Sequence, residues 1–246
     1  MKTSRILNHH RLLSLLAAFV AVCFCSIVLC SAAESTNAPS CKTCTVPKKA
    51  DAAKPDAANE EGWKSLFDGK SLKGWKLTDF IGKGKVEVKD GTIVLGTGRD
   101  LTGISIADTN SVPRMDYELE LEAKRAGGYD FFCGLTFPVG KSYCTLILGG
   151  WGGSVVGISS IDGMDASENE TTKSMEFVKD RWYAIRVRVT SEKLECWIDK
   201  EQVVDVTTTG KKISMRFGEI EESAPLGIAS YDTTGVLRNL RIRRLD

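Results

Sequence analysis

Residues 129–172 differ in composition from the rest of the chain and hold most of the side chains that could act on a ligand. Trp151 stands in the run Gly149-Gly-Trp-Gly-Gly153. Glycine backbone lets a ligand approach closely, and an indole face can pack on the C–H side of a sugar ring. Neighbouring carboxylates could bind sugar hydroxyls or transfer protons. The candidate acids and bases are Asp130, Asp162, Asp165, Glu168 and Glu170.

Aromatic, amide and basic side chains could hold the ligand beside these carboxylates. We expect the binding residues to be Tyr129, Trp151, Asn169, Arg186 and Trp197. The alternative is that the acidic run is a solvated surface loop and that the glycine-rich run is only a bend at a sheet edge.

The stretch Asp162-Gly-Met-Asp165 could contribute oxygen ligands to a divalent metal such as calcium. It lacks the alternating oxygen ligands and the terminal Glu of a helical calcium loop. The sequence therefore predicts no certain cofactor, and it leaves a structural calcium ion as an open alternative.

The only two histidines, His9 and His10, lie in a segment with the order of a secretory signal. Residues 1–33 carry three basic residues, then the apolar run 12–29, then Ser31-Ala32-Ala33 at the expected cleavage point. We expect this signal peptide to be removed. The exported chain then has no imidazole, which excludes Ser–His and Cys–His nucleophiles and imidazole zinc ligands.

Export predicts a periplasmic or extracellular protein with no stable membrane insertion after cleavage. The alternatives are that residues 12–29 anchor the chain in a bilayer, or that Cys30 is lipidated. Cleavage removes three of the 33 Lys and Arg residues and none of the 32 Asp and Glu residues, so the net charge falls from +1 to near −2. This balance does not favour nucleic acid as a partner.

Residues 34–61 are rich in Ala, Lys, Asp, Pro and Ser, without apolar periodicity, and predict a flexible linker. Cys41 and Cys44 within it form a single Cys-x-x-Cys pair. We interpret this pair as an exposed disulfide or an attachment point, and a redox or metal pair is the alternative.

From residue 62 the chain alternates between apolar and polar residues, as in strands with one buried face. Asp90-Gly91 predicts a hairpin with a type I′ turn, and Ser191-Glu-Lys193 predicts a second hairpin. The expected strands lie within residues 85–95, 114–123, 182–190, 194–199 and 235–245. They predict an all-β fold, an antiparallel jelly-roll β-sandwich spanning residues 62–246, with no internal repeat.

The predicted strands also place rows of opposite charge where they could pair. The row Glu118, Glu120 and Glu122 could pair with Arg186 and Arg188 across neighbouring strands, either in a concave groove or on an ordinary outer surface.

The cysteines of the domain could also pair, as a disulfide bond. Cys133 and Cys144 flank the loop 138–142, which predicts a cross-strand disulfide in an exported protein, with two buried thiols as the alternative. Cys196 then remains as a core residue.

Several blocks carry a resemblance to a known family, of which the first is the most specific. They are Leu66-Phe-Asp-Gly-Lys-Ser-Leu-Lys-Gly-Trp75, Val88-Lys-Asp-Gly-Thr-Ile93, Asp116-Tyr-Glu-Leu-Glu120, Asp180-Arg-Trp182 and Gly235-Val-Leu-Arg-Asn-Leu-Arg-Ile242. In these blocks the chain resembles the 3-keto-disaccharide hydrolase domain family, which is related to 3-keto-glucoside lyases and hydratases. The resemblance implies a concanavalin A-like sandwich of the lectin and glucanase type and an oxidised disaccharide or glucoside as partner.

The reaction that this resemblance implies cleaves a 3-keto-glycoside by elimination followed by hydration. The ketone acidifies the proton at C2, a base removes it, the C1 group departs, and water adds to the 2-hydroxy-glucal. The carboxylates named above would supply acid and base, aided by Tyr129, Lys141 or Arg186.

The chain departs from this family's pattern in two places, residues 129–134 and the pair Tyr231 and Asp232. The alternatives are therefore a non-catalytic, lectin-like carbohydrate-binding module and a structural surface protein.

Overall fold

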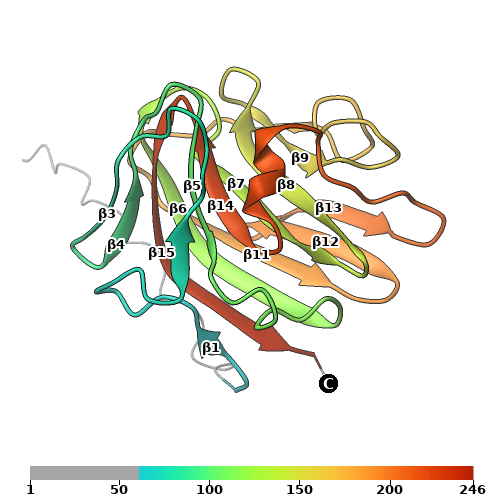
Figure 1. Ribbon diagram of the computed structural model, residues 1–246. Coiled ribbons are helices and arrows are strands. Elements are labelled where there is room, and N and C mark those ends of the chain that lie inside the picture. Colours follow the sequence, from blue (N-terminus) through green and yellow to red (C-terminus); the bar gives the residue numbers. More distant parts are fainter. Residues whose placement is uncertain (1–60, 246) are drawn as a thin grey trace, which may run out of the picture. The chain divides into compact units, whose positions relative to one another are not determined.

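The computed structural model describes residues 61–245, which form two antiparallel sheets stacked face to face (Figure 1). In sheet A the order is β13-β12-β11-β6-β15-β4-β3, and β1 also pairs with β15. Its strands are β1 (Lys64–Ser65), β3 (Val86–Lys89), β4 (Thr92–Leu95), β6 (Tyr117–Gly128), β11 (Tyr183–Val189), β12 (Lys193–Ile198), β13 (Glu201–Thr207) and β15 (Thr233–Arg244).

Sheet B has the order β10-β9-β8-β7-β14-β5-β2. Its strands are β2 (Trp75–Leu77), β5 (Leu101–Ile106), β7 (Cys133–Val139), β8 (Ser142–Gly150), β9 (Val155–Ser159), β10 (Lys173–Ser174) and β14 (Gly227–Tyr231). A short 3₁₀ helix, η1 (Glu219–Ser223), lies before β14. The predicted all-β antiparallel sandwich is confirmed.

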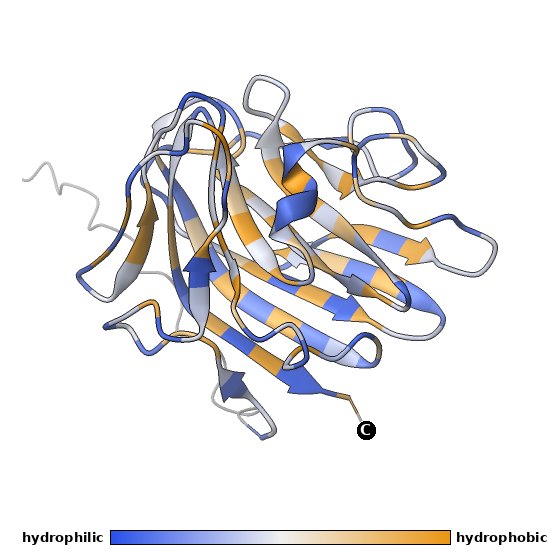
Figure 2. Ribbon diagram, in the orientation of Figure 1, coloured by the Kyte–Doolittle hydropathy of each residue, from blue (hydrophilic) through white to orange (hydrophobic). Residues whose placement is uncertain are grey.

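Period-two alternation places one face of each strand in the core between the sheets. In β6 the side chains of Tyr117, Leu119, Leu121 and Ala123 are buried, and they belong to one apolar cluster with the inward residues of β8. Figure 2 shows the same alternation of apolar and polar residues along the strands. Burial of these rows is the main favourable contribution to folding.

The predicted hairpin at Asp90-Gly91 is confirmed, because β3 and β4 pair across these two residues. Asp90 has φ 50° and Gly91 has φ 73°, the two positive values that a type I′ turn requires. The hairpin of β11 and β12 is confirmed as well, and β15 is the predicted last strand.

The predicted disulfide between Cys133 and Cys144 is wrong, because the register of β7 and β8 keeps the two residues apart. Cys133 lies opposite Leu148, and Cys144 lies opposite Phe137. The hairpin turns at residues 140–141 rather than over a five-residue loop. The two cysteines are thus four pairs apart, about 14 Å at strand spacing, whereas a disulfide needs Cα atoms within about 7 Å.

Both cysteines are free buried thiols, as is Cys196, the predicted core residue. Four features predicted from the sequence lie outside the described residues. They are the signal peptide, Cys30, the Cys41–Cys44 pair and the linker up to residue 60. Within residues 61–245, no helix is long and apolar enough to cross a bilayer.

Opposite charges meet on the outer face of sheet A, at its central strand. Arg186 and Arg188 of β11 lie opposite Glu120 and Glu118 of β6, as the sequence suggested. A second basic row comes from β15, which pairs with the other edge of β6. The contacts are Arg238 Nη2 to Glu122 Oε2 at 2.6 Å, Arg241 Nη2 to Glu120 Oε2 at 2.8 Å and Arg243 Nη2 to Glu118 Oε2 at 2.6 Å.

Glu118 is the most deeply buried member of this ladder, with 2% of its side chain exposed. It contacts Arg243 on one side, and Arg188 Nε lies 3.4 Å away on the other, without hydrogen-bond geometry. Among these paired charges, Glu118 therefore carries the largest structural role, because removing one partner of a buried pair leaves the other charge uncompensated.

Thiol mapping tests the free cysteines. Burial raises the pKa of the Cys133 thiol to about 12 and that of Cys144 still higher. We expect neither thiol to react with iodoacetamide in the folded protein at neutral pH, and both to react in denaturant without a reductant. Peptide mass spectrometry that finds a Cys133–Cys144 cross-link would contradict the register described above.

Substitution of Glu118 tests the ladder. We expect Glu118→Gln to lower the free energy of unfolding by about 3–5 kcal/mol, because Arg243 and Arg188 lose their carboxylate. Urea denaturation measures this change. The control is Glu87→Gln, which breaks an exposed pair with Lys85 and should leave the midpoint unchanged. Equal urea midpoints for Glu118→Gln and Glu87→Gln would show that the ladder contributes no more to stability than an exposed ion pair.

Candidate functional site

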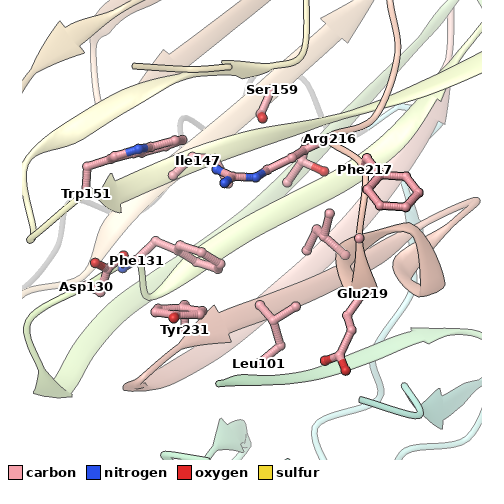
Figure 3. Close-up of a pocket in the computed structure, with 13 residues that line it drawn as sticks. Leu101, Asp130, Phe131, Ile147, Trp151, Ser159, Arg216, Phe217, Glu219 and Tyr231 are labelled. Atoms are coloured by element: carbon pink, nitrogen blue, oxygen red, sulfur yellow. Dashed lines mark hydrogen bonds between the residues drawn. The ribbon is translucent and has the colours of Figure 1, made fainter. Parts of the chain in front are cut away.

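A cleft of about 320 Å³ lies on the outer face of sheet B, and we name it the Trp151 cleft (Figure 3). Sheet B forms its floor, the loop before β7 and the turn after β8 form one wall, and residues 216–220 form the other. Its lining residues are Leu101, Asp130, Phe131, Thr145, Ile147, Trp151, Ser159, Arg216, Phe217, Gly218, Glu219, Ile220 and Tyr231.

The floor follows from strand alternation in β8 and β9. Leu146 and Leu148 of β8 point into the core, so Thr145 and Ile147 point outward into the cleft. Ser159 takes the same outward position in β9. This part of the floor therefore combines one apolar side chain with two hydroxyl groups.

The glycine-rich run after β8 forms a tight turn that presents Trp151. Trp151 itself has φ 49°, and Gly152 and Gly153 have φ 85° and 115°, values that side chains with a Cβ rarely adopt. At Gly153 a Cβ would lie 2.5 Å from the carbonyl oxygen of Tyr129. The indole ends 42% exposed at the cleft, so the run is more than a bend at a sheet edge.

Asp130 accepts two backbone hydrogen bonds, one of which comes from this turn and holds it in place. Gly152 donates its N–H to Oδ2 at 3.0 Å, and Phe131 donates its N–H to Oδ1 at 2.7 Å. The predicted catalytic carboxylate therefore lines the cleft beside Trp151, and each of its oxygens already accepts a hydrogen bond.

Arg125 of β6 supports the same turn from the protein interior. Its Nη2 donates to the carbonyl oxygens of Gly153 at 2.9 Å and Gly149 at 3.3 Å. Its guanidinium also lies 5.4 Å from the ring centroid of Phe132. Burial lowers the pKa of Arg125, and the Asp130 carboxylate partly opposes this shift. Sequence reasoning missed this residue because its partners are distant backbone carbonyls.

Arg216 faces the indole from the opposite wall. Its guanidinium carbon lies 5.8 Å from the Trp151 ring centroid, and Figure 3 shows the side chain extending toward Trp151. Asp165 holds it with a contact of 3.0 Å from Nη1 to Oδ2. The other oxygen of Asp165 accepts hydrogen bonds from the hydroxyls of Ser159 and Ser160. Asp165 thus positions the cation at the cleft.

Aromatic rings complete the rim. Phe131 and Tyr231 lie with their centroids 5.8 Å apart, and Phe217 is 92% exposed. Burial, followed by the carboxylate of Asp100, raises the pKa of Tyr231. Its hydroxyl lies 3.4 Å from Asp100 Oδ1 and so remains protonated at neutral pH. Tyr231, one of the residues at which the chain departs from the family pattern, therefore lines the cleft.

Other predicted residues of the 129–172 segment lie outside the cleft lining. Asp162 and Glu170 both contact Lys211, and Glu168 is exposed. The Asn169 side chain is buried and donates to the carbonyl oxygens of Ile158 and Met164, which closes the loop on itself. Tyr129 is 67% exposed just before Asp130.

The predicted binding residues Arg186 and Trp197 belong to sheet A, on the opposite face of the sandwich. Trp197 alternates with the buried Cys196 and Ile198, so its ring points outward from sheet A. The structure therefore does not bring these two residues together with Trp151.

Among residues 61–245, no three Asp, Glu, Cys or His side chains gather into a group that could hold a metal ion. Within the Asp162–Asp165 stretch, the two carboxylates contact Lys211 and Arg216 of the chain itself. Calcium binding stays a prediction.

The stacked antiparallel sheets and the aromatic-rimmed cleft on one outer face define the class of concanavalin A-like jelly-roll sandwiches. Within this class, the chain belongs to the 3-keto-alpha-glucoside-1,2-lyase-like domain family, which it matches over residues 62–243. It is therefore a member of a carbohydrate-active family, as the sequence blocks suggested. A comparison with curated proteins found no match.

Solved structures share the fold at low sequence identity. The Crh5 transglycosylase in complex with NAG has a TM-score of 0.52 and 12% identity, covering 75% of this chain and 85% of that one. The carbohydrate binding module CBM66 from Bacillus subtilis has a TM-score of 0.48 and 12% identity, covering 69% and 95%. A glycosyl hydrolase family protein from Mycobacterium fortuitum has a TM-score of 0.46 and 9% identity, covering 75% and 99%. These likenesses concern the fold alone.

Hydrogen exchange tests the role of Asp130. We expect Asp130→Ala to speed amide exchange in peptides containing Gly152 by about tenfold, because the turn loses the charge-assisted hydrogen bond from the Gly152 N–H. The matched control is Asp162→Ala, which should leave these peptides unchanged. Unchanged exchange at Gly152 in Asp130→Ala would show that the carboxylate does not hold the turn.

Proposed function

We propose that this domain recognises a sugar ring in the Trp151 cleft. The observation that carries the proposal is the half-exposed indole of Trp151, held opposite the Arg216 guanidinium above a floor with two hydroxyl groups. An indole face suits the C–H side of a pyranose, and the Arg216 guanidinium suits its oxygens. A concave site with apolar walls and few polar groups is the usual form of a ligand pocket.

The contacts of the carboxylates in and near the cleft favour binding without catalysis. Asp130 is engaged with two backbone N–H groups, and Asp165 with two hydroxyls and Arg216. Glu219 also lines the cleft, but Figure 3 shows its carboxylate directed away from Trp151. Two carboxylates therefore do not converge on one reacting bond, as acid and base catalysis of an elimination would need.

Elimination from a 3-keto-glycoside is the second candidate, and two observations favour it. The chain belongs to a family named for such a lyase. Arg216 places a fixed positive charge at the cleft, where it would stabilise the enediolate that forms when the C2 proton leaves. Asp130 would then be the base, since it is the carboxylate nearest the indole turn.

We further propose that the domain is exported and acts outside the cytoplasm. The secretory order of residues 1–33 supports delivery to the periplasm or the cell exterior, where glycans are available. Signal cleavage would leave a chain without histidine, so neither candidate function uses imidazole.

Calorimetry with trehalose and 3-keto-trehalose tests these proposals on the complete exported chain. We expect measurable affinity for at least one of the two sugars. Trp151→Ala should weaken it about tenfold or more, because truncating a central aromatic contact costs over about 1.4 kcal/mol. The control is Trp182→Ala, which removes an indole that lies just before β11 and outside the cleft, and it should leave affinity unchanged.

Product analysis separates the two functions. Affinity without turnover, with or without a chelator, supports recognition alone. Conversion of 3-keto-trehalose that Asp130→Asn abolishes would instead establish elimination. The absence of both affinity and turnover would contradict the two proposals together.

A further inference from the structure

A second hollow, of about 780 Å³, lies on the outer face of sheet A, and we name it the sheet A groove. It runs along the Arg/Glu ladder, across β11, β6 and β15. Its lining includes Trp63, Glu120, Glu122, Arg186, Trp197 and Lys200.

Two half-buried indoles flank the groove from distant parts of the chain. Trp63 precedes β1, which pairs with β15, and Trp197 lies on β12. Arg241 lies 4.6 Å from the centroid of Trp63, and Arg186 lies 4.0 Å from the centroid of Trp197. Arg243 also lies 4.8 Å from the centroid of Trp63, so each indole is fixed by at least one guanidinium, which lowers the entropy cost of stacking a ligand.

The carboxylates of the groove are neutralised by the chain itself. Glu120 contacts Arg241, and Glu122 contacts Arg238 and accepts a hydrogen bond from Asn239. Asp199, at the end of the groove, contacts Arg181 at 2.7 Å.

Two cations of the groove differ from these paired groups. Among residues 61–245, neither Arg186 nor Lys200 has a carboxylate within ion-pair distance. Arg186 lies opposite Glu120 in the register, yet its guanidinium stacks on Trp197 while Glu120 is held by Arg241. The groove therefore presents two cations that form no ion pair with the described part of the chain, Arg186 on β11 and Lys200 in the turn after β12.

We propose that the sheet A groove is a second glycan-binding site, specific for chains that contain hexuronate residues. Trp63 and Trp197 would each stack a sugar ring, and Arg186 and Lys200 would bind the C6 carboxylate. The planar guanidinium of Arg186 can donate two parallel hydrogen bonds to that carboxylate. Glu122 and Asn239 hydrogen-bond to each other, and the second amide N–H and the amide oxygen of Asn239 are suited to ring hydroxyls.

This site is independent of the Trp151 cleft. The two hollows share no lining residue, and they lie on the outer faces of different sheets. One domain would then hold an acidic polysaccharide on one face while it recognises a second sugar on the other.

Titration with α-1,4-trigalacturonate and β-1,4-trimannuronate tests the groove on the complete exported chain. We expect at least one uronate trimer to bind, neutral α-1,4-galactotriose to bind at least about tenfold more weakly, and added salt to weaken uronate binding. Arg186→Gln and Trp197→Ala should each weaken uronate binding about tenfold or more.

The matched controls separate a site from general charge or misfolding. Arg244→Gln removes one exposed arginine of β15 outside the groove and should leave uronate binding unchanged. Arg186→Lys keeps the charge and should retain part of the affinity. Trp151→Ala should leave uronate binding intact, and Trp197→Ala should leave binding in the Trp151 cleft intact.

Failure of both trimers to bind would overturn the groove proposal without affecting the cleft. Equal binding of galactotriose and trigalacturonate, or an equal loss in Arg244→Gln, would overturn its specificity for the carboxylate. Loss of uronate binding in Trp151→Ala would place the trimer in the cleft instead, and would overturn the second site.

Discussion

The alternation of side chains along β6 is the constraint on which the rest of the structure depends. Tyr117, Leu119, Leu121 and Ala123 must face the core, so the intervening glutamates must face outward together on the central strand of sheet A. Three carboxylates in one row repel each other unless cations lie beside them. Strands β11 and β15 supply those arginines on the two sides, and this pairing fixes the central register of the sheet.

The same alternation gives sheet B a different outer face. Its inward rows complete the core, while its outward row in β8 and β9 is Thr145, Ile147 and Ser159, which leaves room for a cleft. Loops then supply what the strands lack. Asp130 and Arg125 hold the turn that presents Trp151, and Asp165 holds Arg216. Two of the candidate acids and bases, Asp130 and Asp165, thus contact the groups that position an aromatic residue and a cation.

Prediction from the sequence worked where the physics is local and failed where it depends on register. Asp90-Gly91 predicted its hairpin because positive φ is a property of the two residues themselves. The Cys133–Cys144 pairing failed because the two cysteines lie at unequal distances from the turn at residues 140–141, so the register of β7 and β8 pairs each of them with another residue. The sequence predicts Trp197 and Arg186 as binding residues in addition to Trp151, yet period-two alternation alone cannot say which sheet a strand joins. Arg216 and Phe217 gave no periodic signal, because they lie in the loop that follows β13 of sheet A and lines the cleft on sheet B.

The sequence by itself determined the strand pattern, the sandwich class, the family and the exposed glycine-flanked indole, because apolar periodicity, turn chemistry and sequence blocks are properties of contiguous residues. Only the tertiary structure decided which charges pair, which face each aromatic residue occupies and which carboxylates are already engaged. Those outcomes depend on contacts between residues far apart in the chain, such as Asp130 with Gly152, Arg216 with Asp165 and Arg243 with Glu118. Their geometry is set by strand pairing within each sheet and by the loops that adjoin it, and no single segment encodes it.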